Sequence, residues 1–143
     1  MIGTTIKQSK HLIELGLDPE TADMCIYVEK GNQPIPYTSD IQLSVENGII
    51  PIPYKTIKLE ERDKFQPMWS LDKLMKLMPG QIKYKGLYYE LELNWYDERL
   101  YYVTYGNSIS DSLHVVCADD YVDGCCEMIA WLLNENIIGC GLK

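Results

Sequence analysis

Apolar and polar positions alternate over residues 87–96, and this two-residue period predicts a strand with one buried and one solvated face. The buried face is expected to carry Leu87, Tyr89, Leu91, Leu93 and Trp95. The outer face is expected to carry Tyr88, Glu90, Glu92, Asn94 and Tyr96. Further strands are expected over residues 100–105 and from Leu113 to Cys117, so this region predicts an antiparallel sheet.

The register of the first two strands depends on the turn at Asp97-Glu98. If Trp95 pairs with Leu100, the buried face also gains Tyr102 and Thr104. On that register the outer face gains Tyr101, Val103 and Tyr105 beside the glutamates.

Segments in which apolar residues have the spacing of a helix precede and follow the predicted strands. Ser70 can cap a helix whose apolar residues recur every three and four positions until Pro79-Gly80. A last helix is expected from about Asp120 to Asn136, capped by Asp119 or Asp120. Its buried stripe is expected to consist of Val122, Cys125, Cys126, Ile129, Leu132 and Leu133.

The N-terminal half is less regular. Thr5 and Gln8 have the spacing of a capping box and predict a helix over residues 6–15, and Pro19 to Met24 reads as a short helix. Strands are expected at 25–28 and 41–45, followed by a turn at 47–48. The two prolines of residues 49–53 predict an edge strand or extended cover, and residues 55–64 a charged connection or irregular helix.

These elements predict an α+β fold with an antiparallel sheet of three or more strands and helices packed on one face. The C-terminal half reads helix, strand, strand, strand, helix. We expect residues 1–143 to form a single compact domain, in which residues 1–66 cover a core built from residues 67–138.

Charge and cysteine content narrow the functional classes. A net charge of −8 has the wrong sign for holding a phosphate backbone, so nucleic-acid binding is not expected. The odd number of cysteines, five, and the polar start of the chain favour a reduced, cytoplasmic setting. No apolar run approaches the roughly 18 residues that a membrane span requires, and no membrane partner is expected.

Three segments carry a resemblance: Leu15 to Met24, Met68 to Leu71, and Val122 to Asn136. They resemble a family of small uncharacterised proteins of gut bacteria and their mobile elements or phages. The resemblance covers most of the chain and implies one domain of this length, but no activity, cofactor or catalytic residue can be carried over from it. The order of elements is also similar to that of double-stranded RNA-binding domains, but the acidic residues Asp119, Asp120 and Asp123 stand where those domains are basic.

Candidate chemical sites are weak. His114 and Cys117 near Cys125-Cys126 have one feature of a zinc site, yet residues three apart on a strand face opposite ways, so we expect the cysteines to be buried and inert. An EF-hand that began at Asp119 would lack ligands at two positions. No base accompanies a nucleophile and no phosphate-binding loop occurs, so no metal, cofactor or catalytic residue is predicted and an enzyme is disfavoured.

Tyrosine is the unusual residue, with 11 copies against one phenylalanine. Tyrosine is enriched at binding interfaces, because its apolar ring ends in a hydroxyl that tolerates water. The candidate interaction surface comprises Tyr88, Tyr96, Tyr101, Tyr105, Glu90 and Glu92. Either the N-terminal segment covers this face or a partner does.

The leading hypothesis is a non-enzymatic interaction or regulatory protein of bacterial or mobile-element origin, with a protein partner or self-association. One alternative is a small-ligand-binding protein or enzyme with a pocket where Glu90, Glu92 or His114 converge. The other is an acidic mimic of nucleic acid.

Overall fold

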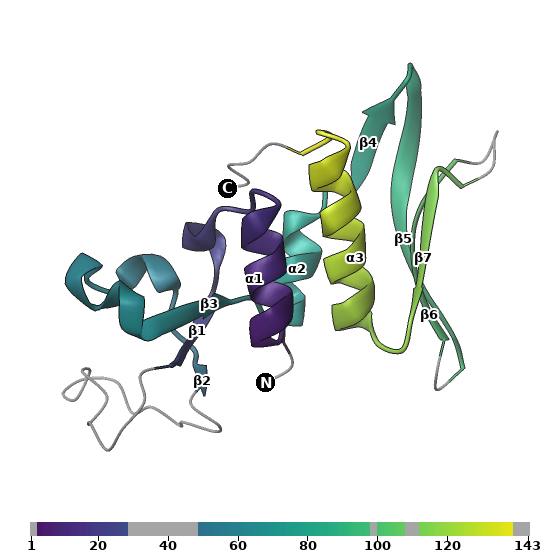
Figure 1. The fold of residues 1–143 in the computed structure, drawn as a ribbon. Helices are drawn as coiled ribbons and strands as arrows, with labels where there is room; N and C mark the ends of the chain where they lie inside the picture. The colour runs from purple at the N-terminus through teal and green to yellow at the C-terminus, as the bar shows by residue number, and fades with distance from the viewer. Residues whose placement is uncertain (1–2, 29–48, 98–99, 108–111, 139–143) are drawn as a thin grey trace.

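The computed structural model describes residues 3–28, 49–97, 100–107 and 112–138, and it has an α+β fold with two antiparallel sheets (Figure 1). The helices lie between a small three-stranded sheet and a larger four-stranded one. The strand predicted at 41–45 and the turn at 47–48 fall outside the described residues.

Helix α1 (Ile6–Glu14) begins at the capping box that the sequence predicts. The Gln8 N–H donates to Thr5 Oγ1 at 3.1 Å, and the Thr5 N–H donates to Gln8 Oε1 at 2.9 Å. These bonds satisfy backbone donors that a helix start otherwise leaves open. The short helix expected from Pro19 to Met24 is a single 3₁₀ turn, η1 (Pro19–Thr21).

The small sheet has the order β2-β1-β3, formed by β1 (Met24–Tyr27), β2 (Ile49–Ile50) and β3 (Phe65–Met68). The prediction of an edge strand at residues 49–53 is confirmed for β2. Strand β3 was not predicted, because its proline argues against a strand; in the structure β3 is at the other edge of the sheet, where a proline is tolerated. The charged connection contains two 3₁₀ helices, η2 (Tyr54–Thr56) and η3 (Leu59–Lys64).

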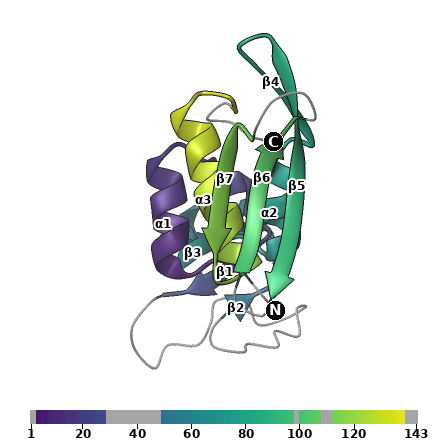
Figure 2. The ribbon, with the colours of Figure 1, turned by 90° about the vertical axis from the view of Figure 1, so that its right-hand side faces the viewer.

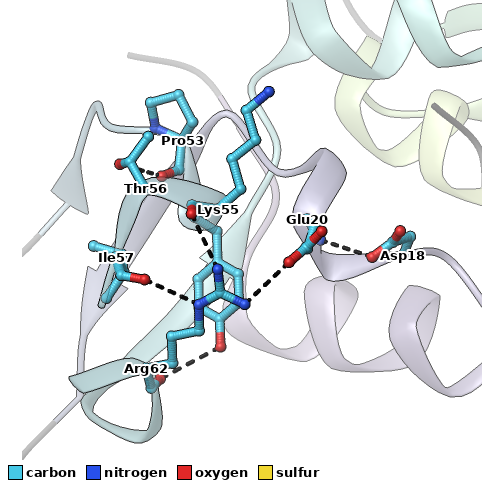
Figure 3. A network of polar contacts seen from close by, with 8 residues as sticks. Asp18, Glu20, Pro53, Lys55, Thr56, Ile57 and Arg62 are labelled. Atoms are coloured by element: carbon cyan, nitrogen blue, oxygen red, sulfur yellow. Dashed lines mark hydrogen bonds and ion pairs between the residues drawn. The ribbon is translucent and has the colours of Figure 1, made fainter. Parts of the chain in front are cut away.

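Arg62 ties these 3₁₀ helices together (Figure 3). Its Nε donates to the Ile57 carbonyl at 3.0 Å and its Nη2 to the Lys55 carbonyl at 3.0 Å. Its Nη1 pairs with Glu20 Oε1 at 3.1 Å, and the guanidinium lies 5.2 Å from the centre of the Tyr54 ring. The planar fork of arginine can serve all these partners at once, and lysine could not. Arg62 is therefore a structural anchor of η1 and η2.

Helix α2 (Leu71–Leu77) is capped by Ser70, whose Oγ accepts from the Lys73 N–H at 3.1 Å. The Asp23 carboxylate in turn accepts from the Ser70 N–H at 2.8 Å and from its hydroxyl. This pair of contacts fixes the start of α2 against the chain that enters β1.

The large sheet has the order β4-β5-β6-β7. Its strands are β4 (Gln81–Tyr84), β5 (Leu87–Asp97), β6 (Leu100–Gly106) and β7 (His114–Ala118). Lys85 and Gly86 join β4 to β5 with φ values of 50° and 83°. Positive φ at both central residues is the mark of a type I′ hairpin turn.

Helix α3 (Tyr121–Asn134) covers the large sheet and packs on α1 and α2. Asp120 caps it by accepting from the Asp123 N–H at 2.8 Å. All six residues of its predicted stripe are buried. Gly124 lets the helix approach β6 closely, because a Cβ at this position would lie 2.9 Å from Val103 Cγ2.

Two hydrophobic clusters follow from this arrangement. The larger one joins the helices to the inner face of the large sheet and includes Leu12, Trp69, Val103 and Leu132. The smaller one consists of Cys25 from β1, Phe65 from β3 and Ile57. Among the described helices, none has the length and apolar character needed to cross a lipid bilayer.

Candidate interaction site

The outer face of the large sheet points away from the helices, and Figure 2 looks onto it. Tyr88 exposes 55% of its surface there, and Glu90 and Glu92 are exposed on the same strand, as alternation predicts. Lys83 Nζ lies 5.6 Å from the centre of the Tyr88 ring. No described residue of 25–28 or 49–54 belongs to this sheet, since these residues form or flank the small one.

The predicted register of β6 is wrong, and Tyr101 and Tyr105 lie on the inner face. Trp95 pairs with Tyr101 instead of Leu100, because a bulge near the turn inserts an extra residue. A slip of one residue moves every side chain of a strand to the other face. Tyr102 therefore lies on the outer face and Val103 on the inner face.

The inner-face tyrosines have packing roles. Tyr105 is 0% exposed, and its hydroxyl donates to the Pro79 carbonyl at 2.6 Å. Burial raises its pKa. The Tyr101 ring meets the Tyr121 ring edge to face at 4.6 Å. Of the candidate interaction residues, Tyr88, Glu90 and Glu92 remain on the outer face, while the side chain of Tyr96 lies outside the described part of the structure.

His114 does not converge with the glutamates. It lies on the inner side, where its ring stacks on Trp131 at 4.4 Å and burial lowers its pKa. Its neighbour in the proposed zinc motif, Cys117, is exposed on the other side of the strand. Among the described residues, no three His, Cys, Asp or Glu side chains are placed so that they could hold one metal ion.

The two cysteines of α3 are buried, as their place on the helical stripe predicts. Cys125 is 0% and Cys126 7% exposed. Burial raises the pKa of each thiol to about 12. A thiol with so high a pKa holds its proton near neutral pH and is a poor nucleophile and metal ligand.

Strand β7 is an open edge of the large sheet. Among the described residues it pairs with β6 on one side and with no strand on the other. The remaining sheet edges carry groups that discourage further pairing: Pro51 follows β2, Pro67 lies in β3, and Lys83 and Lys85 lie in or after β4. Strand β7 contains neither proline nor a formally charged residue, and Val115 exposes 49% of its surface. Such an edge is a template for another strand.

The outward-pointing backbone groups of β7 can be assigned from the ladder. The Leu91 N–H donates to the Gly80 carbonyl, so Leu91 turns its backbone groups toward β4. Alternate residues turn to opposite sides, and this alternation can be followed through the observed pairings to β7. It leaves the N–H and C=O groups of Val115 and Cys117 directed to the open edge.

A groove of about 400 Å³ runs beside this edge, between β7, α1 and α3. Its polar lining consists of Gln8, His11, Asp119, Asp123 and Glu127, and its apolar lining includes Leu12, Cys126 and Ala130. The lining therefore has three carboxylates, and none of the described residues that form it is a lysine or arginine.

Local structure places the groove walls. Gln8, which closes the capping box of α1, also donates through Nε2 to Asp123 Oδ1 at 2.5 Å and so joins α1 to α3. Asp123 and Glu127 are four residues apart and share one face of α3. The sequence predicts a helix cap at Asp119 or Asp120 but gives no sign of the groove, because its walls are 115 residues apart in the chain.

When the chain is compared with protein-family models, with curated proteins and with solved structures, none matches.

Proposed function

We propose that the protein is a non-enzymatic interaction protein that captures an extended segment of a partner protein as a fifth strand beside β7. The single observation that carries this proposal is the edge of β7, which is uncharged, free of proline and, among the described residues, open, while the other described sheet edges carry proline or lysine. Strand addition draws affinity from main-chain hydrogen bonds and specificity from alternate side chains.

The surroundings of β7 support this proposal. An added strand would continue the large sheet and would have the groove between α1 and α3 on its inner side. On its outer side lies a second hollow of about 360 Å³, lined by residues that include Glu92, Tyr102 and Val115. The strand would thus contact side chains on both of its faces.

The test uses substitutions at Val115, whose N–H points to the open edge. Val115→Pro removes that donor and obstructs pairing, whereas an edge proline leaves the ladder to β6 intact. Val115→Thr keeps the N–H group and the β-branched shape, and is the matched control. Thermal melting establishes that both variants fold.

The probe is a displayed library of random short peptides selected against the immobilised protein. We expect selected peptides to slow hydrogen exchange of the Val115 and Cys117 amides, to lose about tenfold or more in affinity for Val115→Pro, and to bind Val115→Thr normally. Failure to select any peptide, or equal binding to the folded proline variant, would overturn the proposal. A dimer that sediments as two chains and protects the same amides would also overturn it.

A further inference from the structure

We infer that the captured segment is basic at alternate positions, with lysine or arginine side chains directed into the groove between α1 and α3. This inference rests on the proposed function, because it concerns the occupant of the same edge. It starts from the charge of the groove, whose lining brings together Asp119, directly after β7, with Asp123 and Glu127 from the first half of α3.

The spacing of the carboxylates suits a strand. Asp123 and Glu127 are about one helical turn apart, roughly 5–6 Å along α3. Side chains two residues apart in a strand are roughly 6.6–6.8 Å apart on one face. Long, flexible lysine or arginine side chains absorb the remaining difference. Basic residues at positions i and i+2 of the captured segment can therefore each meet one carboxylate.

The opposite face of the added strand has different neighbours. The β7 side chains on the outer side are Val115 and Cys117, which are both exposed and carry no formal charge. Cross-strand neighbours on one face of a sheet stabilise each other when their chemistry matches. The intervening residues of the segment are therefore expected to be apolar. The complete pattern is basic, apolar, basic, apolar.

The basic groups near the groove reduce its attraction for a basic segment only slightly. His11 is the one titratable base among the described lining residues, and Lys7 lies one turn before it on α1. Both are on α1, but Lys7 does not line the groove, and the carboxylates are on α3 or directly after β7. The net charge of −8 adds a long-range attraction for a basic segment.

The experiment compares labelled short peptides that differ only in charge or order. One alternates Lys with Val, one alternates Thr with Val, and one has the lysines and valines of the first gathered into two blocks. Fluorescence anisotropy measures the affinity of each at about 0.15 M salt and at about 0.5 M salt. We expect the alternating Lys peptide to bind at least about tenfold more tightly than the other two at the lower salt concentration, and to weaken as salt rises.

Protein variants locate the attraction. Asp119→Asn with Glu127→Gln removes two exposed groove charges and should weaken the alternating Lys peptide by about five- to tenfold. Glu60→Gln with Asp63→Asn removes two exposed charges on η3 and should leave its affinity unchanged. Asp123 is left intact, because it accepts the hydrogen bond from Gln8 that joins α1 to α3.

The outcomes separate the two proposals. If the Thr or block peptide binds as tightly as the alternating Lys peptide, and Val115→Pro abolishes binding, the charge inference is wrong and strand addition stands. If the η3 variant weakens binding as much as the groove variant, the charge inference is also wrong. If no peptide of any charge binds, or binding ignores Val115→Pro, the proposed function itself fails.

Discussion

Gly124→Ala is a sharp test of how closely α3 lies on the large sheet. The added Cβ would lie 2.9 Å from Val103 Cγ2, well inside the roughly 3.5–4.0 Å of ordinary carbon contact. Val103 is 0% exposed and β-branched, so it has little freedom to move away. Overpacking of this kind costs about 1–3 kcal/mol. Alanine recovers about 1 kcal/mol over glycine in a helix.

The balance predicts that Gly124→Ala lowers the free energy of unfolding by about 1 kcal/mol, measured by urea denaturation. The combined change Gly124→Ala with Val103→Ala should be less destabilising than the sum of the single changes, because the shortened Val103 makes room for the new methyl group. Gly80→Ala is the control, since a Cβ there meets nothing within 4 Å. A Gly124→Ala protein that is more stable than the original would refute this reasoning, because helix propensity would then outweigh the contact.

Two further predictions follow from buried groups. Tyr105→Phe should lower the free energy of unfolding, measured by urea denaturation, by about 1–3 kcal/mol, because it leaves the Pro79 carbonyl without its hydrogen-bond donor. An unchanged urea concentration at the unfolding midpoint would contradict the 2.6 Å hydrogen bond. In native protein at pH ~8, iodoacetamide should alkylate the exposed Cys117 and spare Cys125 and Cys126, because burial raises the pKa of both buried thiols to about 12. Peptide mass spectrometry measures the labelling of each cysteine. Equal labelling of all three would contradict this prediction and would mean that α3 opens readily.

The helices and the central strand were predicted from local patterns, because helix caps and the spacing of apolar residues depend only on residues that are close in the sequence. The capping box of Thr5 and Gln8 and the buried stripe of α3 appear where the sequence places them. The alternation of β5 is confirmed for Tyr89 and for Glu90, but Leu87 and Trp95, which were expected to be buried, are 46% and 60% exposed. Strand β4 was missed, since four residues give too short a period to read beside the clear pattern of β5.

Features that depend on distant residues escaped prediction. Strand β6 has large residues on both faces, so its sequence fits either orientation, and the bulge near Asp97 decides between them. Tyr101 and Tyr105 were assigned to the wrong face for this reason. The groove is a meeting of α1, β7 and α3, and nothing in the neighbourhood of Gln8 signals that Asp123 will be its partner.

The packing of α1 has a consequence for how the chain folds. Thr4 exchanges hydrogen bonds with Trp69, with its N–H bonded to the Trp69 carbonyl at 2.9 Å and its hydroxyl accepting from the Trp69 N–H at 3.0 Å. Gln8 closes a separation of 115 residues to α3. Contacts between residues so far apart in the chain form late in folding, because closing the long loop between them loses chain entropy before the contacts contribute any stabilisation. During synthesis α1 leaves the ribosome before α3, and we expect the part of its apolar side that packs on α3 to stay exposed to other proteins until α3 has been made.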